Sequence, residues 1–173
     1  MLFRSGTLFI GIWADGLGGI WRSTDDGRNW EFLAYGTRQI ISLAVDPVNE
    51  DIIYAGANIS GEGALFRSMD GGDTWSEVGN FIYPVWSITI DPNDNNHVYV
   101  GTMGAGIYES FDQGLTFDQV GSPTNGLDNP YVIDMVYAPQ GTPYAGQLFA
   151  ATDAGVFRYD TFAETWSIFG QHS

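Results

Sequence analysis

Apolar and polar residues alternate over short stretches of this chain, and turn-forming residues separate those stretches. The pattern is clearest in the middle of the chain, at residues 85–90, 97–102, 106–110 and 115–120, with Gly, Asn, Asp and Pro between them. Alternation with a period of two is typical of half-buried β-strands, and Val, Ile, Tyr, Phe and Thr are frequent in these stretches. No longer stretch carries apolar side chains at helical spacing without an interrupting Gly or Pro. The sequence therefore predicts an all-β protein.

Three sequence markers recur in phase along the chain. The first has the form Ser-x-Asp-x-Gly-x-x-aromatic and occupies residues 23–30, 68–75 and 110–117, with a decayed fourth copy at 159–166. The second is Asp-Pro at 46–47 and 91–92, and Ala-Pro at 138–139. The third is an aromatic residue two positions before a small one, at Phe9, Tyr54, Tyr99 and Phe149. Markers that repeat together about every 45 residues indicate structural units of one kind.

The alternating pattern within each unit predicts four antiparallel strands. Four such strands in about 40–50 residues form one blade of a β-propeller. We expect units at approximately residues 1–37, 38–82, 83–127 and 128–173. Together they make a single β-propeller segment of about four four-stranded antiparallel blades. An immunoglobulin-like sandwich is the alternative, but a sandwich does not impose one period on turns and aromatic residues alike.

The first marker has a physical explanation as the hairpin between the third and fourth strands of a unit. Ser and Asp side chains bond backbone amides of the turn, Gly adopts the positive φ of the bend, and the aromatic ring folds onto the blade. We therefore assign a structural role to Ser23, Asp25, Gly27, Trp30, Ser68, Asp70, Gly72, Trp75, Ser110, Asp112, Gly114, Phe117 and Trp166.

These turns resemble the Asp-box, or BNR, repeat, and the resemblance spans nearly the whole chain. The repeat occurs in sialidases, xyloglucan-cleaving glycosidases, sortilin-type receptors, photosystem assembly factors and many binding proteins. The resemblance implies a propeller fold and favours an extracellular or periplasmic location, but it does not identify an activity. Residues 1–12 lack the small-residue cleavage site of a signal peptide.

Composition argues against several classes of function. The six basic residues are all Arg and stand against 21 acidic residues, which gives a net charge of −15. Such a chain repels a nucleic-acid backbone. No apolar run approaches the roughly 20 residues of a transmembrane helix, so we expect no membrane insertion. Cys is absent, and His97 and His172 do not suggest a pair, so we expect neither a metal site nor a cofactor.

Residues that break the repeat are candidates for function, because a structural role recurs in every unit. Three carboxylates break it: Asp15, Asp134 and Asp153. Asp134 replaces the Ser of the other innermost strands, whereas Asp15 and Asp153 lie in loops between second and third strands. Trp13 and Trp86 are not repeated in every unit either. They are candidates for stacking on a sugar or binding a peptide, with simple packing as the alternative.

These observations favour a binding or scaffold module for a protein or glycan, without catalysis of its own. The alternative is a fragment of a xyloglucanase-like glycoside hydrolase in which Asp15 or Asp153 supplies a carboxylic acid, since glycoside hydrolysis needs two carboxylates across a cleft. Residues 152–158 are similar to a stretch that carries an acid in those enzymes. Sialidase activity is disfavoured, because the site of that family needs three Arg residues to bind the substrate carboxylate. The repeat accounts for Arg22, Arg67 and Arg158, and the other Arg residues show no sign of converging.

The repeat also predicts how the ring is completed. The marker Asp stands eight residues before Tyr54 and Tyr99, and the same count back from Phe9 reaches Met1. We therefore expect the first blade to lack its inner strand, which leaves fifteen strands in the chain. An open ring exposes an apolar strand edge. We expect the chain to be part of a longer propeller, or to complete its ring with another copy of itself.

Overall fold

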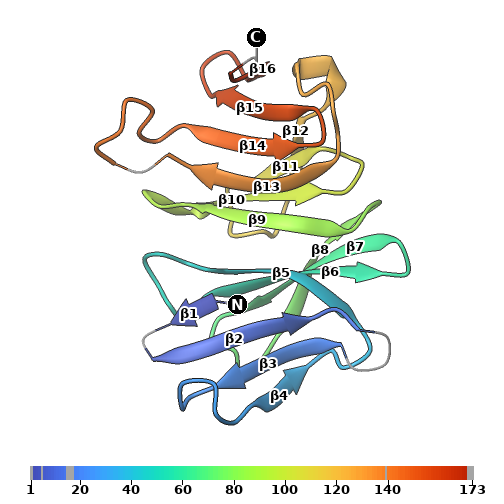
Figure 1. The fold of residues 1–173 in the computed structure, drawn as a ribbon, viewed down its shortest axis with the longest axis vertical. Coiled ribbons are helices and arrows are strands. Elements are labelled where there is room, and N and C mark those ends of the chain that lie inside the picture. The colour runs from blue at the N-terminus through green and yellow to red at the C-terminus, as the bar shows by residue number, and fades with distance from the viewer. Residues whose placement is uncertain (1, 5, 15–17, 139, 171–173) are drawn as a thin grey trace.

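The computed structural model describes residues 2–4, 6–14, 18–138 and 140–170. The described chain forms sixteen β-strands and one short 3-10 helix, arranged in four four-stranded sheets that we call blades 1 to 4 (Figure 1). Blade 1 contains β1 (Leu2–Arg4), β2 (Thr7–Ile12), β3 (Gly19–Ser23) and β4 (Glu31–Ala34). Blade 2 contains β5 (Gln39–Val45), β6 (Ile53–Ile59), β7 (Glu62–Ser68) and β8 (Ser76–Phe81). Blade 3 contains β9 (Val85–Asp91), β10 (Asp94–Thr102), β11 (Ile107–Ser110) and β12 (Asp118–Gly121). Blade 4 contains β13 (Val132–Tyr137), β14 (Leu148–Thr152), β15 (Gly155–Asp160) and β16 (Thr165–Ile168).

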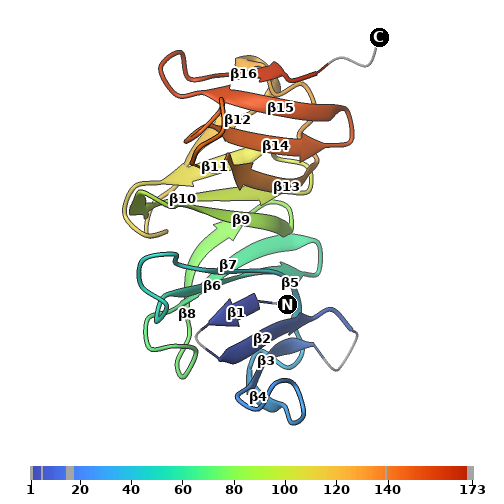
Figure 2. The same cartoon turned by 60° about the vertical axis from the view of Figure 1, so that its left-hand side comes forward.

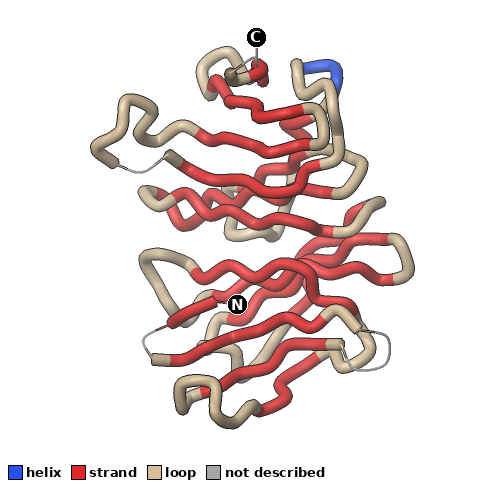
Figure 3. Tube along the Cα trace, viewed as in Figure 1, coloured by secondary structure: helices blue, strands red, loops and turns tan. Residues whose placement is uncertain are grey.

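Each blade is an antiparallel meander in which consecutive strands pair. The first strands of neighbouring blades contact one another, which makes them the innermost strands. Figures 1 and 2 show the blades following one another along the long axis, from blade 1 at one end to blade 4 at the other. The 3-10 helix η1 (Pro123–Asn125) is the only helical segment of the described chain (Figure 3). The predicted all-β fold of four antiparallel blades is confirmed.

The first blade differs from the prediction, because its inner strand is present. β1 pairs with β2, with Leu2 opposite Phe9 and Arg4 opposite Thr7. A tight turn containing Gly6, whose φ is 83°, replaces the longer Asp-Pro connection of the later blades. The inner strand is nevertheless short, with three residues against seven in β5. The described strands therefore number sixteen, and the expected count of fifteen is wrong.

Three apolar clusters hold the blades together, one at each junction. Alternate side chains of a strand point to opposite faces, so each middle blade contributes to two clusters. In β6, Ala55 belongs to the cluster between blades 1 and 2, whereas Tyr54 belongs to the cluster between blades 2 and 3. Both residues are 0% exposed. The third cluster packs Tyr99 of blade 3 against Phe157 of blade 4.

The three Ser-x-Asp-x-Gly turns share one set of hydrogen bonds. In blade 2, the Ser68 hydroxyl donates to Asp70 Oδ1 and accepts from the N–H of Gly72, both at 2.8 Å. Asp70 also accepts from the backbone N–H of Thr74 at 2.8 Å and from its hydroxyl at 2.6 Å. Blades 1 and 3 repeat the bonds of the Ser hydroxyl and of the Asp carboxylate. Hydrogen bonds from Thr74 lower the pKa of Asp70 to about 2.

The turn between β15 and β16 is a tighter hairpin. Asp160 accepts from the N–H groups of Phe162 and Ala163, both at 2.9 Å, and the strand ladder continues to the pair Asp160 and Thr165. Trp166 consequently lies within β16, and its indole N–H donates to a carbonyl of blade 3 at 2.8 Å. The Trp residues of the first two turns donate instead to carbonyls of their own turns. The fourth turn therefore keeps an Asp-centred bend but places its Trp differently.

Candidate functional site

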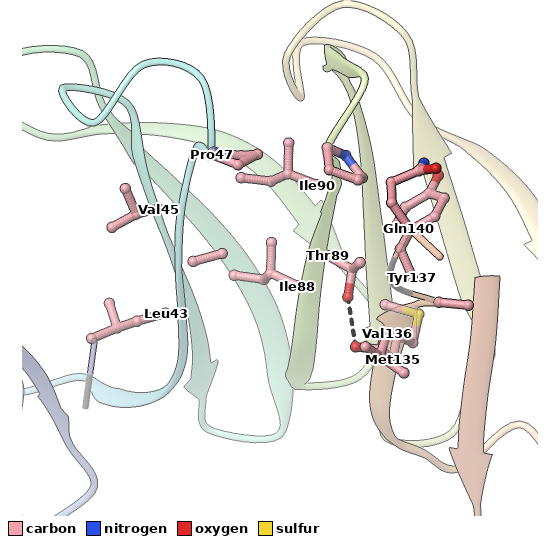
Figure 4. Close-up of a pocket in the computed structure, with 13 residues that line it drawn as sticks. Leu43, Val45, Pro47, Ile88, Thr89, Ile90, Met135, Val136, Tyr137 and Gln140 are labelled. Atoms are coloured by element: carbon pink, nitrogen blue, oxygen red, sulfur yellow. Dashed lines mark hydrogen bonds between the residues drawn. The ribbon is translucent and has the colours of Figure 1, made fainter. Parts of the chain in front are cut away.

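An apolar groove runs across the innermost strands of blades 2, 3 and 4 and encloses about 530 Å³ (Figure 4). Each strand contributes three consecutive positions, namely residues 43–45 of β5, 88–90 of β9 and 135–137 of β13. Pro47, Pro92, Ala138 and Gln140 complete the described lining. We call this surface the inner-strand groove.

The inner-strand groove follows the edges of the strands rather than one face of a sheet. Successive side chains of a strand point to opposite faces, so three consecutive residues border one space only where it runs along a strand edge. In the described chain, β5, β9 and β13 each pair with a strand of their own blade on one side only. The groove therefore combines apolar side chains with strand edges that no strand of a neighbouring blade extends in the described chain.

Hydrogen bonds between blades hold the innermost strands in place. The Thr89 hydroxyl donates to the carbonyl of Met135 at 2.9 Å, which links β9 to β13 (Figure 4). The Ser42 hydroxyl donates to the carbonyl of Val85 at 3.3 Å, which links β5 to β9. The shape of the groove is thus set by bonds that do not depend on a ligand.

The Asp-Pro turn of blade 2 positions one end of the groove. Asp46 is 0% exposed and accepts from the N–H groups of Val48 at 2.8 Å and Asn49 at 3.0 Å. It also accepts from the side-chain amide of Asn95 in blade 3 at 2.9 Å. These bonds fix the turn that places Pro47 against the groove. Asp46 therefore has a structural role that also ties two blades together.

The groove itself carries no ionised side chain among its described lining residues. Tyr137 is the one titratable group there, and burial raises the pKa of its hydroxyl, so the hydroxyl stays protonated at neutral pH. The chain as a whole has a net charge of −15. The groove is consequently an uncharged apolar strip on a strongly acidic protein.

Asp134 lies beside the groove in β13, and its side chain is exposed. Its Oδ1 accepts from the Ser87 hydroxyl of blade 3 at 3.2 Å and from the N–H of Met135 at 2.9 Å. Ser87 in turn accepts from the same N–H at 3.1 Å. The carboxylate thus takes part in the hydrogen bonds that join blades 3 and 4.

Asp153 is exposed in the turn between β14 and β15. Among the described residues, no hydrogen bond or salt bridge holds its carboxylate. Asp134 stands opposite Ala151 in the ladder, so Asp134 and Asp153 belong to the same end of blade 4. No contact joins the two carboxylates in the described part of the chain. Asp15 lies outside the described residues.

Trp13 and Trp86 come together from different blades. Their ring centroids lie 5.6 Å apart with an angle of 84° between the planes, and Trp13 is 56% exposed. Trp86 is the second residue of β9, whereas the groove begins at Ile88 and continues towards the other end of that strand. Trp86 is half-buried, so exposed Trp13 dominates this second surface, near the opposite end of the inner strands.

Among the described residues, His, Asp and Glu side chains form no group of three or more that could hold a metal ion. No helix of the described chain has the length and apolar character needed to cross a membrane.

The inner-strand groove was not among the sites predicted from the sequence. A signal for it exists, because each lining triplet ends one residue before a Pro-containing marker, at 46–47, 91–92 and 138–139. The same register in three blades aligns the triplets side by side. The contact between Trp13 and Trp86 has no comparable signal, since the two residues come from unlike positions in their units.

The fold is that of known propellers. No protein family and no curated protein matches the chain. Among solved structures, an ancestral GH74 enzyme matches with a TM-score of 0.77 at 18% identity, over 98% of this chain and 23% of that chain. The GH74 xyloglucanase from Xanthomonas campestris matches with a TM-score of 0.76 at 18% identity, over 98% of this chain and 29% of that chain.

A further match is YCF48 bound to a D1 peptide, with a TM-score of 0.57 at 14% identity, over 99% of this chain and 59% of that chain. The chain therefore spans less than two thirds of the length of each of these proteins. Identities this low establish the propeller fold and no shared activity.

Proposed function

We propose that this chain is a propeller binding module, without catalysis of its own, that takes an extended protein segment into the inner-strand groove. The observation that carries the proposal is the uncharged apolar strip across three inner strands. Its volume of about 530 Å³ lies in the range of ordinary ligand sites. The apolar lining favours apolar side chains over a sugar, which needs more polar partners.

The strand edges favour an extended backbone as the ligand. An extended peptide can add to the edge of a sheet through backbone hydrogen bonds while its side chains enter neighbouring pockets. At Met135 the N–H and the carbonyl are already bonded, so a peptide would have to use other residues of these edges. The surrounding acidic surface favours a segment that also carries basic residues. YCF48 has been solved with a peptide bound, which supports a protein partner for a propeller of this general fold.

Two panels of short peptides test the proposal. In the first panel apolar residues alternate with Lys, and in the second Ser replaces each apolar residue at the same charge. We expect fluorescence anisotropy to show binding of the first panel only. Equal binding of both panels would mean that the acidic surface attracts Lys and that the groove takes no part.

Val45→Thr and Val48→Thr are matched variants for this assay. Val45 lines the groove, whereas Val48 is 68% exposed in the following turn and does not line it. Placing a hydroxyl in an apolar contact weakens the affinity about tenfold. We expect that loss for Val45→Thr and unchanged affinity for Val48→Thr. Identical affinities for both variants would place the peptide elsewhere.

A glycan is the second candidate ligand, and the pair of exposed Trp13 and half-buried Trp86 supports it, because aromatic faces stack on sugar rings. Incubation with xyloglucan oligosaccharides tests this candidate. Binding that is lost in Trp13→Ala, without turnover, would assign a glycan-binding module. Turnover that is abolished by Asp153→Asn would assign the hydrolase alternative, with Asp153 as the acid.

A further inference from the structure

We propose that the uncovered face of blade 4 binds the uncovered face of blade 1 in a second copy of this chain, and that two copies close one ring. The inference is independent of the ligand of the inner-strand groove. It rests on a comparison of equivalent positions in the four blades, because three blade junctions inside the chain show how such faces are covered.

The first observation is an apolar position on the third strand of each blade. Ile20, Leu65 and Ile107 stand opposite the small marker residue of the second strand, and all three are 0% exposed under the following blade. Val156 holds this position in blade 4, opposite Ala151, and is 42% exposed. Blade 4 therefore has the apolar face of a blade that another blade covers.

The second observation is an Arg beside that position. Arg22 donates to Asp73 of the following blade at 2.6 Å, and Arg67 donates to the carbonyl of Gln113 of the following blade at 2.6 Å. Arg158 occupies the same register position in blade 4. Among the described residues, no hydrogen bond or salt bridge occupies its guanidinium. Arg158 is thus placed to reach the turn of a following blade.

The opposite face of blade 1 is the matching surface. Trp21 and Phe32 form a T-shaped pair there with centroids 5.3 Å apart, and Phe32 is 46% exposed. Phe66 and Phe157 hold the position of Trp21 in blades 2 and 4, where they are 0% and 2% exposed. The preceding blade covers both of them. Blade 1 therefore has the apolar face of a blade that follows another.

The turn of blade 1 supplies a partner for Arg158. Asp26 stands where Gln113 stands in blade 3, and both have a φ of 60°, so their carbonyls hold the same place in the turn. The exposed carboxylate of Asp26 adds a negative charge that Gln113 lacks. Arg28 stands where Asp73 stands in blade 2, so this position offers Arg158 no counterpart of the bond from Arg22 to Asp73. The two faces therefore match in apolar character and in the carbonyl of Asp26, which corresponds to the carbonyl that Arg67 bonds in blade 3.

A second copy fits these faces because each chain carries both halves of the junction. Because the two faces differ, a single contact between two copies leaves the blade 4 face of one copy and the blade 1 face of the other uncovered. Head-to-tail contacts between unlike faces form a closed ring when the rotation allows it. With two copies, a second and identical contact covers the remaining faces, and every blade then has two neighbours.

Light scattering after size exclusion tests the proposal on the full chain at micromolar concentration. We expect twice the chain mass of 18.9 kDa. Val156→Asp should raise the dissociation constant of the dimer at least about tenfold, because it buries a charge in the contact. Phe162→Asp is the matched control, since Phe162 is 99% exposed in the last hairpin and outside both faces. Circular dichroism checks that each variant is folded.

Mixing two variants separates this contact from other modes of association. Val156→Asp spoils the blade 4 face and Phe32→Asp spoils the blade 1 face. Each variant alone should be monomeric, whereas the mixture should form dimers through the one intact pair of faces. A folded wild-type monomer would overturn the proposal and assign the faces to a different partner. A dimer that survives Val156→Asp, or a series of larger species in the wild type, would also overturn it.

Discussion

Replacing Ser68 with Ala tests whether the turn hydroxyls hold the blades together. Ser68 is 1% exposed, and its hydroxyl bonds both Asp70 and the N–H of Gly72 at 2.8 Å. The substitution removes these bonds and a longer one from the N–H of Asp70 at 3.3 Å, and it leaves the buried N–H of Gly72 without its acceptor. A buried donor without a partner costs about 1–3 kcal/mol, so we expect the free energy of unfolding to fall by about 2 kcal/mol. For a chain of this size the melting temperature should fall by about 4–8 °C.

Urea unfolding followed by circular dichroism and Trp fluorescence measures this loss. Ser76→Ala is the control, because Ser76 is exposed at the start of β8 and its hydroxyl makes no hydrogen bond among the described residues. We expect the control to change the free energy of unfolding by less than about 0.5 kcal/mol. If Ser68→Ala changes it no more than the control does, the hydroxyl does not stabilise the turn and the reasoning is refuted.

Three further predictions concern stability. Hydrogen bonds from neighbouring Thr side chains hold the pKa of Asp70 and Asp112 at about 2, below the ordinary value of 3.8. The two ionised carboxylates therefore stabilise the folded chain fully above about pH 4, and this stabilisation is lost as the pH falls towards 2. A melting temperature that stays constant between pH 4 and pH 2 would contradict this prediction. Phe66→Ala, at a position 0% exposed, should lower the free energy of unfolding by about 3–5 kcal/mol in the same urea assay. Gly72→Ala should lower the free energy of unfolding more than Gly114→Ala does. Both glycines have a positive φ, but a Cβ at position 72 would lie 2.8 Å from an aromatic carbon, whereas the nearest atom to a Cβ at position 114 would be 3.5 Å away. Equal losses of free energy for the two variants would contradict this prediction.

The blade architecture could be predicted because its determinants are local. A marker turn joins two strands within a few residues, and its Ser, Asp and Gly make the same bonds in blades 1, 2 and 3. The period of the aromatic residues then sets which side chains face the next blade, as Tyr54 and Tyr99 do. Local chemistry repeated in phase is enough to determine strand order in a meander.

Strand boundaries near the turns were less predictable. The stretch 115–120 has the apolar content of a strand, but β12 begins at Asp118. The Asp112 carboxylate accepts from the N–H groups of Leu115 and Thr116 at 2.9 and 2.8 Å, which keeps both residues in the turn. A side chain that bonds the backbone thus overrides the strand preference of the residues that follow it.

The sites depend on contacts between blades, which a single sequence does not display. The contact of Trp13 with Trp86 and the bond from Ser87 to Asp134 both join residues of different blades. The inner-strand groove likewise exists only where three strands lie side by side. Asp153 was predicted as a loop residue that could supply a carboxylic acid. The structure places it exposed in the turn between β14 and β15, and its role as an acid stays a prediction.

Chemical-shift mapping by NMR tests binding in the inner-strand groove most directly. The chain is labelled with ¹⁵N and titrated with a peptide of alternating apolar residues and Lys. We predict that the largest amide shifts fall in residues 43–45, 88–90 and 135–137, while the Ser-x-Asp-x-Gly turns remain unchanged. Shifts that gather around Trp13 and Trp86, or no shifts at all, would contradict the proposal that the groove binds an extended protein segment.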